Sequence, residues 1–415
     1  MTNDVDARAI NVVRGLAMDA VQAANSGHPG TPMALAPLAH VLYTRILRYD
    51  AGDPEWPDRD RFVLSAGHAS MLLYAMLHLT GYGLTLDDLR AFRQWGSRTP
   101  GHPEYGHAPG IESTTGPLGQ GFGNGVGMAI AEEHLRSRFG PEVCDHRTFA
   151  ICSDGDLMEG VSHEAASLAG HLKLGRLVYV YDDNHITIDG KTELALSDEA
   201  GRRFEAYGWH VLRLGEVADD LDALERGLRD AMAEEERPSL VILRSHIGYP
   251  SPKFTDTPEA HGAPLGADEV AKVKEILGMP AGERFWVPDD VAALYREAGS
   301  RGRKERQAWL QRLQALRLSQ PELAEEYEAC LAGQGRPGWE AKLPSWPVGE
   351  SVATRVACSD VLGAIADLVP GLFGGGADLT GNTGTKLKGF GVFSPEDRKG
   401  RQMYFGVREH GMGSS

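Results

Sequence analysis

Oxygen-bearing side chains that suit a metal ion follow two apolar stretches of this 415-residue chain. Asp154 and Gly155 come directly after TFAICS, and Asn184 follows RLVYVYDD. One helix and one strand would fill the interval, which brings Asp154 and Asn184 side by side at the carboxyl edge of a parallel sheet. A carboxylate and an amide oxygen are hard ligands of the kind that Mg²⁺ takes with a backbone carbonyl, diphosphate oxygens and water, and Gly155 would let backbone N–H groups approach the phosphates. The pattern predicts a magnesium–diphosphate site, although a single aspartate after a strand is more often a helix N-cap.

A histidine placed in a stiff turn is the second candidate for chemistry. In SGHPGTP the glycines permit a sharp reversal, and Pro29 and Pro32 restrict it, so His28 can be held in place with little loss of entropy. An imidazole held there can donate hydrogen bonds and shuttle protons. The alternative is a structural or solvated side chain, and that interpretation is retained for the histidines in helical patterns, which are His78, His163 and His171.

A glycine-rich stretch, TTGPLGQGFGNGVG, leads into a further helical pattern. As a bare Gly-x-Gly pattern it is weak evidence for dinucleotide binding, and the residues before it are loop-like rather than a strand, which disfavours an NAD site. The start of the helix can still bind a phosphate or present backbone groups to a heterocycle.

The elements that would position these residues alternate between short apolar strands and helices, which predicts an α/β fold with a parallel sheet covered on both faces. Strands are expected at RFVLS, TFAICS, RLVYVYDD, SLVILRSH, GLFGGGADL and QMYFGV. Helices are expected over 6–24, up to Gly81, from 158 to Gly175 and over about 352–368. A charged helical pattern runs from about 288 to 332, and a stretch rich in Gly, Pro and Trp follows it up to residue 350.

Composition narrows the class of protein. Hydrophobic residues make up 42% of the chain and the net charge is −16, which argues against binding nucleic acid or anionic membranes through a basic surface but leaves room for a local phosphate pocket. The four cysteines show neither metal spacing nor a disulfide framework, and Cys152 is expected to be a buried core thiol. The sequence has no apolar run long enough for a membrane span, so a cytoplasmic protein is expected.

A set of motifs resembles transketolases in content and order from Arg8 to Met412: SGHPG, SAGHAS, TPGHPE, TTGPLGQG, SDGD with YDDNHITIDG, FEAYGWHV, HGAPLG, GGGADL and YFGVREHGM. The resemblance is to the N-terminal portion of these enzymes. It implies a transferase that uses thiamine diphosphate and Mg²⁺, or another divalent cation such as Ca²⁺, to move a two-carbon ketol unit between sugar phosphates. The implied sugars are of the xylulose 5-phosphate and ribose 5-phosphate class, the implied pathway is the pentose phosphate pathway, and the implied assembly is a homodimer.

The resemblance further implies roles for individual residues. The implied metal ligands are Asp154, Asn184 and the backbone carbonyl of Ile186. The other implied cofactor contacts are His68, Gly116, Pro117, Leu118, Gly155 and His261. The implied catalytic residues are His28, His102, His261 and Glu409. The implied substrate contacts are His28, His261, Arg355 and Asn382.

Glu409 would activate the cofactor, and the reaction would pass through an ylide and an enamine. Because Glu409 must hold or share a proton, a buried position with a raised pKa would suit it. Each active site would be shared between two subunits, one of which supplies Glu409. Two departures from the family pattern, Ser153 for a glycine and Asn382 for a serine, are expected to change little.

The same resemblance divides the chain. A diphosphate-binding domain with a helical extension is expected over 1–320, a linker over 321–350 and an incomplete pyrimidine-binding domain over 351–415, without a third domain. The chain ends shortly after Glu409, so it is expected to be truncated. The alternatives are an inactive module that binds thiamine diphosphate and Mg²⁺, a dihydroxyacetone synthase, or a deoxyxylulose-phosphate synthase. SGHPG together with HGAPLG favours transketolase over the last of these.

Overall fold

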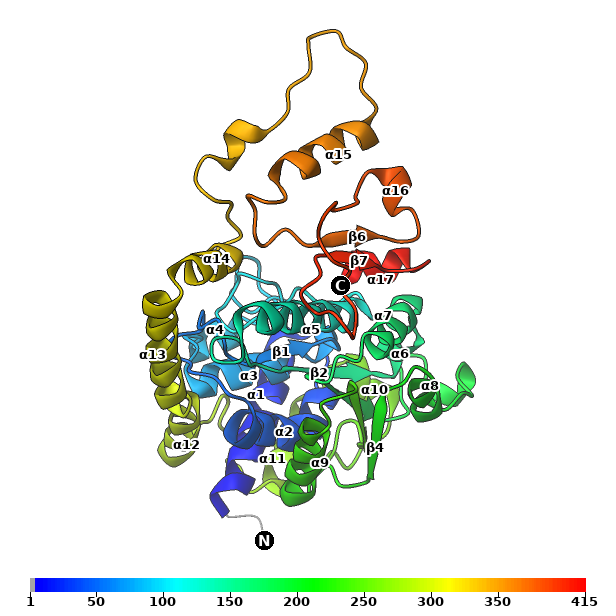
Figure 1. Ribbon diagram of the computed structural model, residues 1–415. Coiled ribbons are helices and arrows are strands. Elements are labelled where there is room, and N and C mark those ends of the chain that lie inside the picture. The colour runs from blue at the N-terminus through cyan, green and yellow to red at the C-terminus, as the bar shows by residue number, and fades with distance from the viewer. Residues whose placement is uncertain (1–3) are drawn as a thin grey trace.

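The computed structural model describes residues 4–415, and a five-stranded parallel sheet lies at its centre (Figure 1). The strand order is β1-β2-β3-β5-β4, and all neighbouring strands are parallel. These strands are β1 (Arg61–Leu64), β2 (Thr148–Ser153), β3 (Leu177–Asp183), β4 (His210–Gly215) and β5 (Ser239–Arg244). A second, two-stranded parallel sheet consists of β6 (Gly374–Gly376) and β7 (Gln402–Tyr404). The predicted parallel α/β fold is confirmed.

Strand β4 was not predicted. It lies at the edge of the sheet, next to β5 alone, and its side chains are half-buried or exposed. Its sequence, HVLRLG, therefore lacks the continuous apolar run that marks the strands buried on both faces.

Helices cover both faces of the sheet, and further helices form the outer and C-terminal parts of the chain. They are α1 (Asp4–Ala24), α2 (Gly30–Val41), α3 (Ser70–Thr80), α4 (Leu86–Arg90), α5 (Gln120–Phe139), α6 (Asp154–Met158), α7 (Gly160–His171), α8 (Ala200–Ala206), α9 (Leu221–Ala233), α10 (Pro258–Gly262), α11 (Ala267–Ile276), α12 (Asp289–Ser300), α13 (Arg303–Ser319), α14 (Pro321–Leu331), α15 (Thr354–Ile365), α16 (Thr380–Thr383) and α17 (Glu409–Ser414). Short 3-10 or π turns are η1 (Leu42–Ile46), η2 (Gly67–Ala69), η3 (Thr192–Leu194) and η4 (Trp339–Lys342).

The two faces of the sheet contribute to two separate apolar clusters. Phe62 and Leu64 pack with residues of α1, α2, α3 and α9, whereas Val63 between them packs with residues of α5 and α7. This is the alternation that a strand imposes on its side chains. Cys152, on β2, is fully buried in the second cluster, as predicted.

Two helix boundaries differ from expectation. The helix expected from 158 to Gly175 corresponds to α7, which begins two residues later because Glu159 is extended between α6 and α7. Helix α7 then ends at His171, and a left-handed Lys173 turns the chain. Residues 321–331 form α14, as the helical pattern up to about 332 predicts, although the domain division placed them in the linker. Tyr327 of α14 lies in a buried cluster with residues of α5 and α13.

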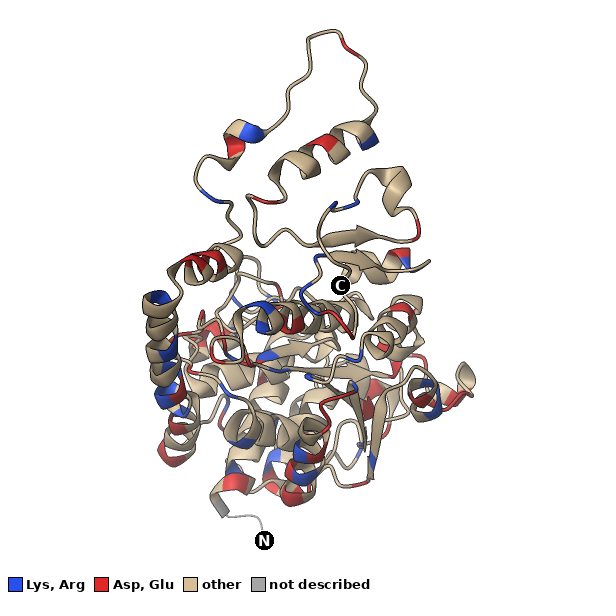
Figure 2. Ribbon diagram, viewed as in Figure 1, with Lys and Arg blue, Asp and Glu red and all other residues tan. Residues whose placement is uncertain are grey.

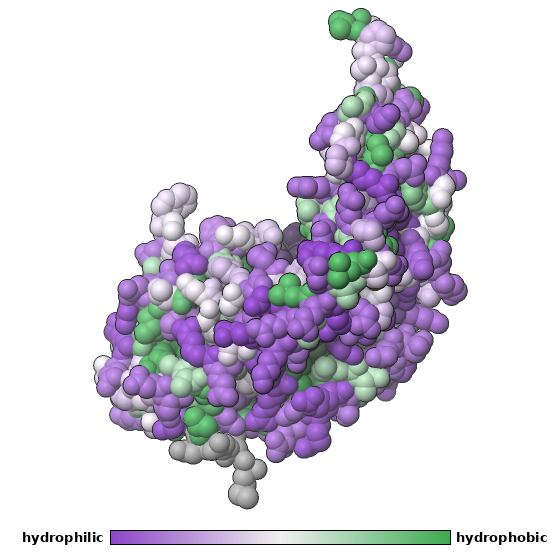
Figure 3. Space-filling model, turned by 60° about the vertical axis from the view of Figure 1, so that its left-hand side comes forward, coloured by the Kyte–Doolittle hydropathy of each residue, from purple (hydrophilic) through white to green (hydrophobic). Residues whose placement is uncertain are grey.

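The C-terminal region stands above α5 and α7 (Figure 1). Met403 and Phe405 join the apolar cluster of α5, and the Gly411 N–H donates to Glu164 Oε2 on α7 at 2.7 Å. The segment before α15 projects from the body (Figure 3), and its Val348 is fully exposed. Basic and acidic side chains are intermixed over the outer helices (Figure 2). Within residues 4–415, no helix combines the length and the apolarity that crossing a membrane requires.

Candidate active site

A cavity of about 490 Å³ opens at the carboxyl ends of β1, β2 and β3, the edge at which the sequence placed the site. The lining comes from the ends of β2 and β3, from the loops that follow β1 and precede α2 and α5, and from α10. The residues that line it are His28, His68, His102, Gly116, Leu118, Ser153, Asp154, Gly155, Asn184, Ile186, Thr187, Ile188, Asp189 and His261.

Four imidazoles meet on one side of this cavity. The ring centroid of His28 lies 5.3 Å from that of His68, 6.2 Å from that of His102 and 5.8 Å from that of His261. His68 and His261 are stacked at 4.9 Å. Each ring comes from a different segment: His28 precedes α2, His68 lies in η2, His102 precedes α5 and His261 lies in α10. The fold therefore joins four histidines that are far apart in the sequence.

The four rings are held in the neutral form. Burial, with smaller contributions from the nearby His261, Arg93 and His102, lowers the pKa of His28 to about 4. Burial also lowers the pKa of His68, His102 and His261. Three ring nitrogens are buried without a hydrogen-bond partner: His28 Nδ1, His68 Nε2 and His261 Nδ1. Because an unpaired buried polar atom is costly, these atoms fit a polar ligand in the cavity.

Asp154 and Asn184 face the cavity from the ends of adjacent strands. The Tyr181 hydroxyl donates a short hydrogen bond to Asp154 Oδ1, while Asp154 Oδ2 is buried without a partner. Burial, with a smaller contribution from the carboxylates of Asp182 and Asp183, raises the pKa of Asp154 to about 7 against the opposing hydrogen bond from Tyr181. A free, buried carboxylate oxygen beside an amide fits a divalent cation.

The Asn184 amide is fixed on both sides. Its Nδ2 donates to Asp182 Oδ2 at 2.7 Å, and its Oδ1 accepts the Ile186 N–H at 2.9 Å. Asp182 is fully buried and also accepts a hydrogen bond from the Ser245 hydroxyl, at the end of β5. The role of Asp182 as the partner of Asn184 was not predicted.

A third buried carboxylate, Asp156, joins the loops that form the cavity. Its Oδ1 accepts from the Ser65 hydroxyl at 2.7 Å and from the Gly119 N–H at 2.8 Å, and its Oδ2 accepts from Ser153 N–H at 2.9 Å. The carboxylate thereby connects the ends of β1 and β2 with the loop before α5. Its position after the strand end was visible in the sequence, but these contacts were not.

Glycines allow the segments around the cavity to approach one another. A Cβ on Gly67 would lie 2.6 Å from the Gly116 nitrogen, and Gly116 itself has a φ of +135°, which side chains rarely adopt. A Cβ on Gly155 would lie 2.8 Å from Leu118 Cδ1. The sequence signal for this packing was the glycine in each of the motifs SAGHAS, TTGPLGQG and SDGD.

Several residues assigned from the sequence lie elsewhere. Pro117 lines a neighbouring surface pocket together with Glu409, and Leu118 lines both that pocket and the cavity. Glu409 is exposed at the start of α17, and the buried surroundings expected for it stay a prediction, because a second subunit would have to supply them. Arg355 on α15 and Asn382 on α16 are exposed and do not line the cavity. Their helices leave these side chains on the outer face of the C-terminal region.

The fold and the cavity define a parallel α/β protein with a polar cavity at the carboxyl ends of its strands. A family model described as transketolase, thiamine diphosphate binding domain, matches residues 5–336, and one described as transketolase, pyrimidine binding domain, matches residues 350–415. The chain belongs to the transketolase family, so the resemblance seen in its motifs is confirmed.

Known transketolases resemble the chain throughout its length. It is 49% identical to the transketolase of Halalkalibacterium halodurans, an alignment that covers 100% of this chain and 62% of that protein. It is 47% identical to chloroplastic transketolase-1 of Arabidopsis thaliana, over 98% of this chain and 56% of that protein. A crystal structure of Pichia stipitis transketolase in complex with sedoheptulose-7-phosphate matches with a TM-score of 0.95 and 44% identity, over 99% of this chain and 62% of that one. The chain thus spans less than two thirds of the length of these relatives.

Proposed function

We propose that this chain provides the part of a transketolase active site that binds thiamine diphosphate and Mg²⁺. The observation that carries the proposal is that four histidines line one cavity together with Asp154 and Asn184. Three of these histidines have a buried ring nitrogen without a hydrogen-bond partner. The proposed reaction transfers a two-carbon ketol unit from a ketose phosphate to an aldose phosphate. The complexes of Pichia stipitis transketolase with sedoheptulose-7-phosphate and xylulose-5-phosphate support sugar phosphates as its substrates. A cytoplasmic place in the pentose phosphate pathway completes the proposal.

The residues of the cavity divide into two groups by chemistry. Asp154, Asn184 and the main-chain carbonyl of Ile186 would hold Mg²⁺ or another divalent cation such as Ca²⁺ against the diphosphate, with Gly155 next to them. Thiamine diphosphate, when bound, would supply a carbon nucleophile and an electron sink. Gly116, Pro117 and Leu118 would lie against the cofactor.

The histidine side of the cavity would handle the sugar. His28, His102 and His261, neutral at pH 7, can each donate a hydrogen bond to a sugar oxygen through one ring nitrogen and accept one through the other. They would therefore position hydroxyl groups and move protons to and from the oxygen on which charge develops, while His68 would contact the cofactor.

The remaining assigned residues require a second subunit. Glu409 is exposed in a surface pocket that shares Leu118 with the cavity, so the proposal places it against the site of a partner in a homodimer. There it would hold a proton on the cofactor's aminopyrimidine. Arg355 and Asn382 would bind the substrate phosphate across the same interface. In this proposal the diphosphate-binding domain covers 1–320 and the pyrimidine-binding region covers 351–415.

A second candidate function is binding without turnover. It is favoured by the exposed positions of Glu409, Arg355 and Asn382, none of which lines the cavity of its own chain. A module of this kind would take up thiamine diphosphate and Mg²⁺ but form no sugar product.

Two measurements on the purified chain test the proposal. Calorimetric titration with thiamine diphosphate, with and without Mg²⁺, should show magnesium-dependent binding that the double variant Asp154→Ala plus Asn184→Ala loses. Asp189→Ala is the matched control, because Asp189 lines the cavity but has no assigned contact with the metal. Unimpaired magnesium-dependent binding in the double variant would refute the metal assignment. Formation of sedoheptulose 7-phosphate by the wild-type chain then decides between the transketolase and the module that only binds.

A further inference from the structure

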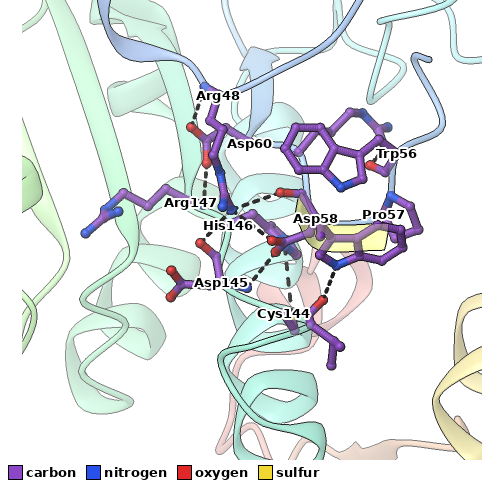
Figure 4. Close-up of polar contacts among 12 residues, drawn as sticks. Arg48, Trp56, Pro57, Asp58, Asp60, Cys144, Asp145, His146 and Arg147 are labelled. Atoms are coloured by element: carbon purple, nitrogen blue, oxygen red, sulfur yellow. Dashed lines mark hydrogen bonds and ion pairs between the residues drawn. The ribbon is translucent and has the colours of Figure 1, made fainter. Parts of the chain in front are cut away.

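A buried aspartate, cysteine and histidine meet at the end of the sheet opposite the active-site cavity (Figure 4). Asp58 precedes β1, and Cys144 and His146 precede β2, so all three lie where these strands begin. Asp154 and the four active-site histidines lie where strands end or in the loops beyond. Because β1 and β2 are adjacent and parallel, the residues before them are brought together without any closeness in the sequence.

The geometry points to a structural zinc site formed by Asp58 Oδ1, Cys144 Sγ and His146 Nδ1, and we propose that this chain binds one zinc ion there. The candidate ligand atoms of the three side chains all lie within 4.8 Å of one another. His146 Nδ1 lies 3.5 Å from Asp58 Oδ1 and 3.9 Å from Cys144 Sγ. In a tetrahedral zinc site, ligand atoms about 2.0–2.3 Å from the metal lie about 3.3–3.6 Å apart. The two spacings to His146 Nδ1 are therefore within a few tenths of an ångström of those in a zinc site.

The distance between His146 Nδ1 and Asp58 Oδ1 fits two ligands of one shared ion better than it fits a direct hydrogen bond. An N–H to oxygen hydrogen bond is ordinarily about 2.7–3.2 Å long, and the contact between His146 and Asp58 is longer than that. Burial raises the pKa of the Cys144 thiol, so the sulfur would carry its proton until a cation displaced it. Binding would then form the metal–sulfur bond and release that proton to solvent.

The chemistry of the donors selects the metal. A thiolate, an imidazole and a carboxylate are together typical of Zn²⁺, whereas Mg²⁺ and Ca²⁺ take oxygen ligands. The thiolate and the carboxylate would balance the two positive charges of the ion. A fourth ligand would be a water molecule or the main-chain oxygen of Glu132, which lies 3.7 Å from Cys144 Sγ.

The surroundings already orient one of the three ligands. Asp58 Oδ1 accepts the Asp145 N–H at 2.6 Å, and Asp58 Oδ2 pairs with Arg48 Nη2 at 3.2 Å. The first bond leaves a lone pair of Oδ1 for a metal, and the second holds the carboxylate plane without using Oδ1. Supporting contacts of this kind fix ligands at known metal sites.

The position of the cluster indicates what the ion would do. Val143, directly before Cys144, accepts hydrogen bonds at its main-chain oxygen from Trp309 Nε1 on α13 at 2.9 Å and from the Tyr327 hydroxyl on α14 at 2.8 Å. A zinc ion at Cys144 would tie this segment to the loop before β1. It would thereby stabilise the attachment of the outer helices α13 and α14 to the sheet.

Metal content is the first test. Wild-type chain purified without chelator, exposed to zinc and passed through a desalting column should retain one zinc ion per chain by elemental analysis. Cys144→Val and His146→Gln should not retain it. Two controls should keep it: Cys330→Ser, which changes a cysteine remote from the cluster, and Asp154→Ala plus Asn184→Ala, which removes the proposed magnesium ligands. Equal zinc content in wild type and Cys144→Val would overturn the proposal.

Cobalt provides a test that does not depend on whether the variants fold. Co²⁺ in place of zinc should give wild-type chain a thiolate-to-cobalt charge-transfer band in the near ultraviolet, together with the intense visible bands of tetrahedral cobalt. Zinc should bleach both, and should also raise the midpoint of thermal unfolding of the wild type. Absence of the charge-transfer band from wild-type chain loaded with cobalt would show that Cys144 binds no metal.

Discussion

At the scale of single residues, the cavity depends on side chains that support its lining residues without lining the cavity themselves. Asp182 fixes the Asn184 amide, and the Tyr181 hydroxyl fixes the Asp154 carboxylate. All four side chains are buried, so rotation of any one would leave polar atoms unpaired. The orientation of the proposed metal ligands is therefore set by their neighbours on β3.

Replacing Asp182 by asparagine tests this positioning role. The new side chain would keep the size of the old one but would face the Asn184 Nδ2 group with a weaker acceptor or with a second donor. We expect the affinity for Mg²⁺ in the presence of thiamine diphosphate to fall by about 10–100-fold, the usual effect of losing a partner of a metal ligand. Calorimetric titration with Mg²⁺ measures it directly.

Asp183→Asn is the matched control for Asp182→Asn. It removes the same charge from the next residue, but Asp183 pairs with the ring of His185 at 3.1 Å and makes no hydrogen bond to Asn184. Equal losses of affinity in the two variants would mean that only charge matters, and that Asp182 has no positioning role.

The residues that line the cavity could be predicted from the sequence more readily than the residues that support them. Asp154 and Asn184 could be found because each directly follows an apolar strand, and adjacent parallel strands must bring such ends together. The contact of Asp182 with Ser245 could not, because it joins two strands separated by 63 positions and leaves no periodic signal.

At the scale of elements, helix contacts set the positions of the loops that carry the histidines. Helices α3 and α12 cross closely at Gly299, where a Cβ would lie 1.9 Å from the Thr80 main-chain oxygen. The Gly299 main-chain oxygen also accepts the Ala51 N–H at 2.8 Å. Because α3 follows directly after η2, which carries His68, this crossing helps to fix one wall of the cavity.

Gly299→Ala should therefore destabilise the chain. The added methyl group meets a backbone oxygen, which cannot move aside as a flexible side chain would, so α3 and α12 must separate. We expect a loss of about 1–3 kcal/mol in the free energy of unfolding, measured by urea denaturation. Gly363→Ala, in the exposed part of α15 with no atom near the added Cβ, should be neutral or stabilising by up to about 1 kcal/mol. Equal behaviour of the two variants would show that the close crossing carries no energetic weight.

Element boundaries show where sequence patterns lose information. Strands buried on both faces were recognised from their apolar runs, but the edge strand β4 was missed because one of its sides faces solvent. Helix α7 ends before the glycine expected to stop it, because Lys173 adopts a left-handed conformation that its residue type does not favour. Local composition indicates that a turn is near, and tertiary packing decides where it falls.

At the scale of the whole molecule, the C-terminal region is joined to the body by packing as well as by the chain. Phe393 is buried in the cluster of α5, with its ring centroid 5.4 Å from that of Phe373 and 6.3 Å from that of His134. Arg408 Nη2 on the C-terminal side donates to the Ser167 hydroxyl on α7 at 3.0 Å. The link between the two parts, by contrast, is exposed around Val348.

Cutting the exposed link separates the contribution of packing from that of chain connection. A site-specific protease sequence inserted between Val348 and Gly349 lies in a projecting segment that tolerates insertion. After cleavage, we expect the fragment that begins at Gly349 to remain bound to the body, because apolar contacts and hydrogen bonds hold it. Size-exclusion chromatography of the cut protein, followed by mass spectrometry of the peak, measures the association.

Phe393→Ala should release that fragment, whereas Val392→Ala should not. Phe393 is 2% exposed and loses a buried ring, which costs about 3–5 kcal/mol, or at least a hundredfold in the dissociation constant at about 1.4 kcal/mol for each factor of ten. Val392, its neighbour in the sequence, is 44% exposed and gives up far less contact. Spontaneous separation of the cut wild-type protein would contradict the packing argument. Retention in both variants would instead assign the attachment to the hydrogen bonds around Arg408 and Gly411. The fate of the fragment bears directly on the proposed function, since β6, β7 and α17 can present Glu409 to a partner only while they stay docked on α5 and α7.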